Sequence, residues 1–543
     1  MAAAGAIRRW FSSDGGASDR LIPRWIFLRA LGLIYFSAFF SLVFQIKGEV
    51  GPHGILPAGD YLKAVAQALH AGRYWYAPTL LWFNSGSHML MALCWVGMIA
   101  AIVLTVNIWP RAMLVVCFVC YLSFIAAAGD FASYQSDGML LEAGFISLFF
   151  TAPGFLPGLG KWSPPSRASL FLLQWEWFRI YFESGIAKLV SGDPEWRHLT
   201  AMDEYYQNGP LPTWIGWYVQ HLPHGFQAFT AGATLVMELG LVWMLFFPRR
   251  IRIICFFIVT PWEIGVILTA NYCFLNYLVL SLGFLLLDDR FIGQFLPRSW
   301  SARILLVQKA PAATAAGSVL PVLHALSAEP KAQRADWRRH WSAFKLALAT
   351  VMLSWIFYST TVQLLWMLAP ALPFPRSPVA ALDPFRIANQ YGLFAVMTRG
   401  RYEIEFQGSS DGQNWTPYPF RYKPQDVYTP PGIYAPYQPR FDWNLWFASL
   451  TTWRHAPIVP NTEIRLLSND PDVLALFAGN PFAKSPPKQV RAVLWQYWFT
   501  SMQEKRQTGK WWRRQLIGPY APTLELKPNG ELGVVEENQP RSP

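Results

Sequence analysis

The sequence predicts a polytopic α-helical membrane domain of about nine spans (N-in/C-out), followed by a β-rich, sandwich-like α+β domain on the extracytoplasmic side. Three observations support this fold class. The 543 residues are 53% hydrophobic and only 14% charged, whereas a soluble domain is about 25% charged. Several apolar runs approach the roughly 20 residues that cross a bilayer. Beyond Pro370 the chain changes to short strand-like runs joined by turn formers.

The membrane domain is expected over residues 24–370, after a short basic cytoplasmic tail at 1–23. It includes a long basic connector at 288–341, which is predicted to be cytoplasmic. Apolar runs bounded by turn formers indicate nine spans. They lie at about 24–46, 82–108, 112–128, 138–154, 168–190, 226–247, 251–269, 271–287 and 342–369.

The basic residues indicate the orientation of these spans. With a cytoplasmic N-terminus, nine spans place Arg111, Lys161, Arg249 and the 288–341 connector on the cytoplasmic side. This distribution follows the positive-inside rule. Gaining or losing one span would spoil the agreement, so the charges support an odd number of spans more strongly than the number nine.

The extracytoplasmic domain is expected over residues 371–526. Alternating apolar residues predict strands at 402–406 and 419–422. Residues 442–453 and 490–506 are interpreted as helices. The polar residues 527–543 are predicted to be a disordered tail.

The fifth span is unusual because it carries four ionisable residues. Glu176, Arg179 and Glu183 recur at helical spacing and share one face. Lys188 lies five residues beyond Glu183, roughly 140° around the helix. Its ammonium must either reach the extracytoplasmic interface or meet a partner from another span. The candidate partners are Glu142, Glu238 and Glu263. Two interpretations stay open: a structural ion pair, or a catalytic base.

Several other classes of chemistry are disfavoured. The five cysteines fall inside apolar runs, so a disulfide framework is not expected. His221 and His224 lack adjoining acidic or cysteine ligands, and no metal or cofactor is predicted. The net charge is +12, but the basic residues lie beside apolar spans rather than on a phosphate-binding face. No nucleic acid is therefore expected as a partner.

Aromatic residues concentrate in the C-terminal domain between Tyr434 and Phe447. Trp, Tyr and Arg dominate binding hot spots. We therefore predict that Tyr434, Arg440, Trp443 and Trp446 bind a protein client. The alternative is that these rings form the core of the β-rich domain.

Long strings in this chain resemble the lipase maturation factor family over most of its length. They include GDPEWRHLTAMDEYYQNGPLP (192–212), NQYGLFAVMTRGRYEIEFQGSSDGQNW (389–415), YKPQDV (422–427), APYQPRFDWNLWFASL (435–450) and NPF (480–482). The first string contains a motif loop with Asp193, Trp196, Arg197 and Asp203.

The resemblance implies a multi-pass membrane protein with a lumenal C-terminal domain and a secreted protein client such as a lipase. Membrane lipids are the other expected partner. The implied location is the endoplasmic reticulum membrane in a eukaryote or the inner membrane in a bacterium. The implied role is non-catalytic, chaperone-like client binding that helps secreted lipases become active.

A more distant resemblance concerns the membrane half alone. GPHGILPA (51–58) and RIYFESGIAKL (179–189) are similar to the membrane domain of the vitamin-K-dependent gamma-carboxylase and its bacterial relatives. Lys188 falls on the position of a lysine implicated there in base chemistry. The alternative function is therefore a membrane enzyme that acts on a lipid or quinone-like substrate. Lys188 would be its base, with Glu183 and Arg179 beside it.

Overall fold

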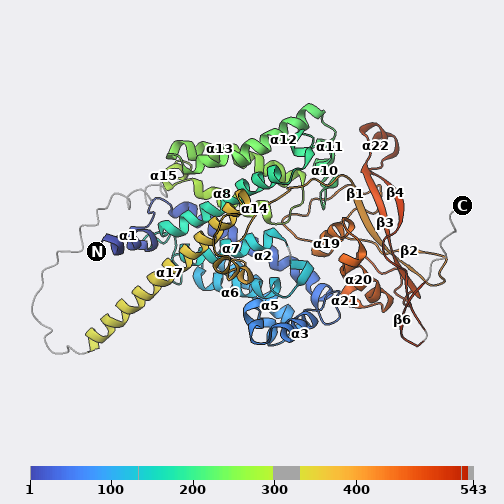
Figure 1. The fold of residues 1–543 in the computed structure, drawn as a ribbon, viewed down its shortest axis with the longest axis horizontal. Helices are drawn as coiled ribbons and strands as arrows, with labels where there is room; N and C mark the ends of the chain where they lie inside the picture. The colour runs from blue at the N-terminus through green and yellow to red at the C-terminus, as the bar shows by residue number, and fades with distance from the viewer. Residues whose placement is uncertain (1, 133, 297–329, 528, 536–543) are drawn as a thin grey trace, which may run out of the picture.

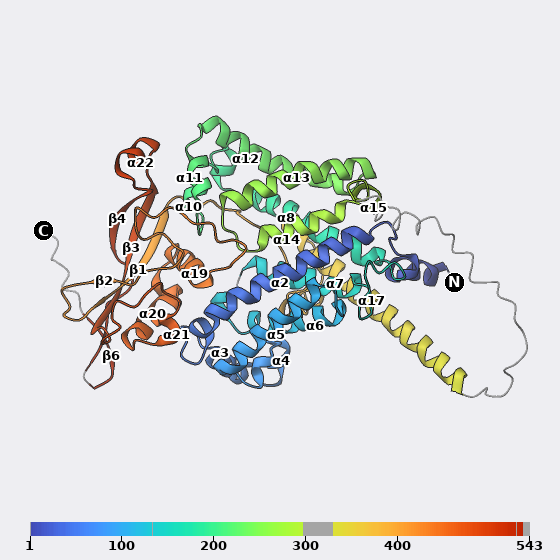
Figure 2. The same cartoon turned by 180° about the vertical axis from the view of Figure 1, so that it is seen from behind.

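The computed structural model describes residues 2–132, 134–296, 330–527 and 529–535. Most of the predicted cytoplasmic connector and the last eight residues lie outside these ranges. Figures 1 and 2 show a helical body that carries a sheet domain at one end. The N-terminus lies at the opposite end of the molecule from the sheet (Figure 1).

Each of the nine predicted spans overlaps a helix of the body. Apolar sequence and the absence of internal breakers explain most of these helices, although Pro261 lies inside one of them. Their bounds are α2 (Leu21–Val50), α5 (Ser87–Thr105), α6 (Pro110–Ile125), α7 (Gln135–Phe150), α8 (Arg167–Val190), α12 (His224–Leu239), α13 (Arg249–Thr269), α14 (Leu275–Gly283) and α17 (Pro330–Leu368).

Five helices in the described ranges are long and apolar enough to cross a membrane. These are Leu21–Val50, Ser87–Thr105, His224–Phe246, Arg249–Thr269 and His340–Leu368. The helices α6 and α14 are apolar but shorter, and α7 has only 16 residues. The membrane-type helical region is therefore confirmed, while the count of nine and the orientation stay predictions.

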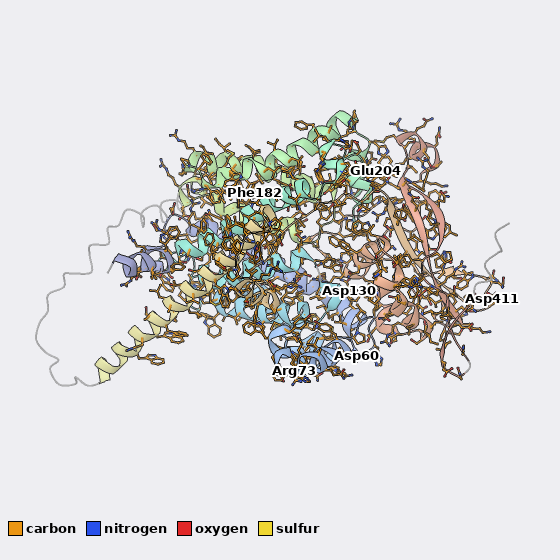
Figure 3. The ribbon with its side chains drawn as sticks, viewed as in Figure 1. Asp60, Arg73, Asp130, Phe182, Glu204 and Asp411 are labelled. Carbon is orange, nitrogen blue, oxygen red and sulfur yellow. The ribbon has the colours of Figure 1, made fainter. Side chains whose placement is uncertain are left out.

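The helix α8 lies at the centre of the body and contacts α7, α12, α14 and α17. Shorter helices connect or flank the long ones: α1 (Ala2–Phe11), α3 (Ala58–Leu69), α4 (Arg73–Tyr76), α9 (Pro194–Arg197), α10 (Tyr205–Asn208), α11 (Trp214–Gln220), α15 (Asp289–Ile292) and α18 (Ser377–Ala380). The 3-10 turns are η1 (Ser13–Gly15), η2 (His70–Gly72), η3 (Leu80–Trp82), η4 (Gly129–Ala132), η5 (Leu241–Phe246), η6 (Phe284–Leu286), η7 (Asp383–Phe385) and η8 (Trp453–His455). Asp60 and Arg73, on α3 and α4, lie at the outer edge of the body (Figure 3).

The C-terminal domain contains one antiparallel sheet in the order β2-β1-β3-β5-β6, and β4 also pairs with β3. The strands are β1 (Arg401–Ser409), β2 (Thr416–Pro417), β3 (Gln489–Phe499), β4 (Trp512–Pro519), β5 (Leu524–Leu526) and β6 (Leu532–Val534). The expected sandwich is wrong for the described residues, because helices rather than a second sheet cover the inner face. Those helices are α19 (Arg440–Ser449), α20 (Ile458–Leu467) and α21 (Pro471–Leu474), between the sheet and the body (Figure 1).

Three local predictions in this domain fail. Residues 490–506 do not form one helix; they contain β3 and, after a break, α22 (Met502–Thr508). Residues 489–497 pair with β1, and the aromatic and β-branched side chains of this run suit a half-buried strand. Residues 419–422 form no regular strand. The strand β6 pairs with β5 inside the segment that was expected to be a tail.

Candidate functional site

The charged face of α8 binds a segment of the chain some 200 residues further on. We call residues 389–398 the strap; it links the helical body to β1. Arg179 donates to the Asn389 carbonyl at 2.6 Å, and the Tyr391 amide donates to Glu183 at 2.7 Å. Lys188 donates to the Leu393 carbonyl at 2.9 Å. Because these contacts reach backbone atoms, α8 fixes the path of the strap.

The motif loop, which follows α8, also forms hydrogen bonds to the strap. Asp193 accepts from the Met397 amide at 2.6 Å, and Trp196 donates to the Phe394 carbonyl at 3.0 Å. Asp193 also caps the short helix α9. Arg197 is exposed, and Asp203 contacts His224 at 3.0 Å. Two of the four predicted loop residues therefore bind the strap, and the other two lie away from it.

A buried ionic cluster lies beneath the start of the strap. Arg179 forms a short contact with Glu142 of α7 and lies 3.8 Å from Glu183. Tyr391 donates its hydroxyl to Glu142 at 2.9 Å. Glu176 is also fully buried but forms no ion pair with any described residue. The predicted shared face is thus real, although Glu142, from another helix, supplies the main partner.

Lys188 faces away from this cluster, as its spacing predicts, and its partner is Glu238 of α12. The Lys188 Nζ and Glu238 Oε1 atoms are 2.9 Å apart, and the ammonium lies 5.0 Å from the Trp196 ring centroid. The adjoining cavity measures about 80 Å³. That is far below the roughly 300–1,000 Å³ of ligand pockets. The geometry therefore favours a structural ion pair over a catalytic base for Lys188.

The aromatic residues predicted to bind a client lie at the junction between the sheet domain and the body. Arg440 is buried and forms a bidentate pair with Asp137 of α7 at 2.7 and 2.8 Å. Trp446 donates to the Asn208 carbonyl at 3.1 Å. Tyr434 is half-buried, and its amide donates to Asn271 at 2.7 Å. These residues join the two halves; their client-binding role stays a prediction.

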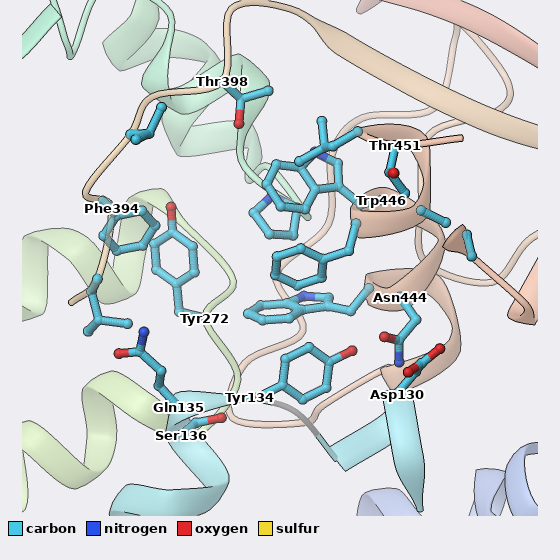
Figure 4. Close-up of a pocket in the computed structure, with 18 of the residues that line it drawn as sticks. Asp130, Tyr134, Gln135, Ser136, Tyr272, Phe394, Thr398, Asn444, Trp446 and Thr451 are labelled. Atoms are coloured by element: carbon cyan, nitrogen blue, oxygen red, sulfur yellow. The ribbon is translucent and has the colours of Figure 1, made fainter. Parts of the chain in front are cut away.

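Trp443 and Trp446 nevertheless line an open cavity of about 580 Å³ at this junction, which we call the junction cavity (Figure 4). The two rings are only 6% and 8% exposed. The aromatic residues that line it come from the body, the strap and α19: Tyr134, Tyr272, Phe394, Trp443, Trp446 and Phe447. Asn444, Thr451 and His455 add a few polar groups. Such a lining is typical of sites for apolar ligands or side chains.

Sequence reasoning missed the role of the strap and of Asp137. The strap residues belong to the 389–415 string that carries the family resemblance. Their pairing with α8 has no signature in composition or periodicity, because the groups contacted are backbone amides and carbonyls. All five cysteines are buried and unpaired. Within the described ranges, no three His, Cys, Asp or Glu residues are grouped as metal ligands.

The long apolar helices, the buried ionic helix and the attached antiparallel sheet together define a polytopic membrane protein with a C-terminal sheet domain. The lipase maturation factor transmembrane domain matches residues 22–294, and the lipase maturation factor C-terminal domain matches residues 387–522. The chain belongs to the lipase maturation factor family, and its role is that of a membrane maturation factor.

Individual relatives are similar over nearly the whole chain. Lipase maturation factor 2 of Gallus gallus is 31% identical over an alignment of 582 residues, which covers 93% of this chain and 81% of that protein. Lipase maturation factor 1 of Bos taurus is 30% identical over 520 residues, 93% of this chain and 89% of that protein. Lipase maturation factor 2 of Homo sapiens is 30% identical over 621 residues, with 97% and 86% covered. No solved structure matches the chain.

Proposed function

We propose that this membrane-anchored maturation factor binds a secreted lipase while the lipase folds, and that the junction cavity receives an apolar part of this client. The relatives are named for lipase maturation. The observation that carries the proposal is the aromatic cavity with an exposed apolar mouth. Val396, Phe447 and Leu450 line that mouth and are 67%, 44% and 44% exposed.

The burial pattern gives the cavity two parts with different tasks. Trp443 packs edge-on against Tyr134 at 5.3 Å, so the floor is fixed before any client binds. Phe447 of α19 and Leu450, which directly follows this helix, are partly exposed and free to pack against a partner. A preformed aromatic floor lowers the ordering cost of binding. The site therefore suits a client whose own core is still exposed.

The proposal includes the arrangement in the membrane. Residues 24–370 carry nine spans with the N-terminal tail and the connector in the cytoplasm, and residues 371–526 form the extracytoplasmic domain. The basic residues between the spans support this arrangement. In a eukaryote the domain faces the lumen of the endoplasmic reticulum; in a bacterium it faces outward from the inner membrane. A secreted lipase passes through the compartment on that side.

The test is capture and activation of a secreted lipase in cells that lack their own maturation factor. Phe447→Asp places a charge at the mouth and is expected to weaken lipase capture by at least about tenfold, with a matching loss of secreted activity. Ile517→Asp is the matched control, because Ile517 is 52% exposed on β4 and is not part of the cavity lining. A photo-crosslinker at position 447, but not at 517, should attach to the lipase.

Two results would refute this site. One is full capture and full lipase activity with Phe447→Asp. The other is equal crosslinking from positions 447 and 517, which would mean that the client contacts the whole domain surface without using the cavity.

A further inference from the structure

A second cavity, of about 560 Å³, lies beside the start of the strap; we call it the polar cavity. Its lining includes the C-terminal end of α6 at Ile125 and Ala126, the N-terminal end of α7 at Gln135, and Gln363 close to the end of α17. Three membrane-type helices thus end at this cavity. In the proposed arrangement of the spans, on which this step rests, the cavity lies level with the membrane boundary on the side of the sheet domain.

Two opposite charges in the polar cavity lie close enough to attract each other but form no salt bridge in the described structure. Asp383 and Arg386 both line it and are exposed, and neither forms an ion pair with another described residue. The Oε1 atom of Gln363 is buried and lacks a hydrogen-bond partner in the described structure. Tyr61 and Tyr76 supply two phenol groups to the same lining. One cation, one anion and neutral polar groups together complement a zwitterion.

Exposed aromatic residues surround the polar cavity on the membrane side. Tyr74, Trp75 and Tyr76 of α4 are each more than half exposed, and Phe83 is 84% exposed. Trp75 packs against Phe385, the neighbour of Arg386, with ring centroids 4.9 Å apart. Aromatic side chains are enriched at membrane–water interfaces. The outlying position of α4, marked by Arg73 in Figure 3, agrees with contact to lipid headgroups.

We propose that the polar cavity binds the headgroup of a zwitterionic phospholipid. Arg386 receives the phosphate, because the guanidinium fork matches phosphate oxygens. Asp383 and the rings of Tyr61 and Tyr76 receive the ammonium group by charge pairing and cation–π contact. The acyl chains enter the bilayer beside the aromatic residues of α4. The polar cavity shares Tyr134 and Gln135 with the lining of the junction cavity, but Asp383, Arg386, Tyr61 and Tyr76 line the polar cavity alone.

The experiment is native mass spectrometry of the full-length protein in detergent with defined lipids. Phosphatidylethanolamine should bind at least about tenfold more tightly than diacylglycerol, which has no phosphate. Arg386→Gln should weaken phosphatidylethanolamine binding by about the same factor. The matched control is Arg376→Gln, an exposed arginine of the same linker outside the cavity lining. It should bind lipid as the wild type does.

A second variant tests the ammonium side of the site. The wild type should prefer phosphatidylethanolamine to phosphatidylglycerol, which lacks the amine, and Asp383→Asn should remove this preference. The melting temperature of each variant shows whether it is folded. Unchanged lipid binding in folded Arg386→Gln, or equal binding of diacylglycerol, would overturn the proposal. So would displacement by an equal concentration of soluble glycerophosphoethanolamine, which would assign the cavity to a free phosphate ester.

Discussion

Removing the Arg440 guanidinium should loosen the junction between the sheet domain and the body. Arg440 of α19 binds Asp137 at 2.7 and 2.8 Å, the Phe131 carbonyl at 2.6 Å and the Tyr121 hydroxyl at 3.0 Å. Arg440 and Asp137 are essentially inaccessible to water. Arg440→Met keeps the bulk of the side chain and removes all four hydrogen bonds.

The expected loss of stability follows from the Asp137 carboxylate, which is left without its partner. Breaking a buried ion pair by removing one partner costs about 3–5 kcal/mol, because the remaining ion is desolvated and unpaired. Asp137 keeps only the hydrogen bond from Tyr121, at 2.5 Å, among the side-chain contacts described here. Arg440→Met is therefore expected to destabilise the protein by about 3–5 kcal/mol. The double variant Arg440→Met/Asp137→Leu should recover to within about 1 kcal/mol of the wild type.

The assay is equilibrium unfolding of the purified protein in detergent, followed by tryptophan fluorescence. Arg421→Met is the control, because Arg421 is exposed in the same domain and should change stability by less than about 0.5 kcal/mol. The reasoning is refuted if Arg440→Met costs no more than this control. A double variant no more stable than Arg440→Met would also refute it, since the cost would then not come from an unpaired Asp137.

Two further predictions concern single buried groups. Lys188→Met leaves Glu238 unpaired and should lower the free energy of unfolding by about 3–5 kcal/mol. The double variant Lys188→Met/Glu238→Leu should restore both folding and lipase activation. Restored folding without activation would instead favour a catalytic Lys188. Burial raises the pKa of Glu463 in α20 from 4.5 to about 9. Between these values the folded state keeps a proton that the unfolded state releases, so stability falls as pH rises, by up to about 1.4 kcal/mol per unit. Glu463→Gln should flatten this slope in melting curves at pH 5, 7 and 9, and an unchanged slope would contradict the assignment to Glu463.

The helices of the membrane-type body could be predicted because hydropathy is a local signal. The predicted span 24–46 lies within α2 (Leu21–Val50), and the span 168–190 differs from α8 (Arg167–Val190) by one residue. Residues 490–506 were misassigned because Ala, Leu and Gln within this run are compatible with a helix. Pairing with residues 401–409, far away in sequence, makes the first part a strand. Tertiary context overrides propensity there.

The candidate site was only partly predictable for a related reason. The spacing of Arg179 and Glu183 placed them on one face, and the five-residue offset of Lys188 indicated a separate partner. The choice of Glu238 over Glu142 and Glu263 depends on how α12 packs on α8, which no local pattern encodes. The strap could not be predicted at all, because its amides and carbonyls are the same for any sequence.

The hydrogen bonds between α8 and the strap can form only late in synthesis of the chain. Arg179 and its acceptor at Asn389 are 210 residues apart in the chain. At about 5–20 residues per second, α8 is made about 10–40 s before the segment that completes its hydrogen bonds. During that interval the helix has ionic groups without their final partners. A chain that stops before the strap therefore keeps every helix of the body and the ion pairs with Glu142 and Glu238, but it lacks the hydrogen bonds that join α8 to the strap.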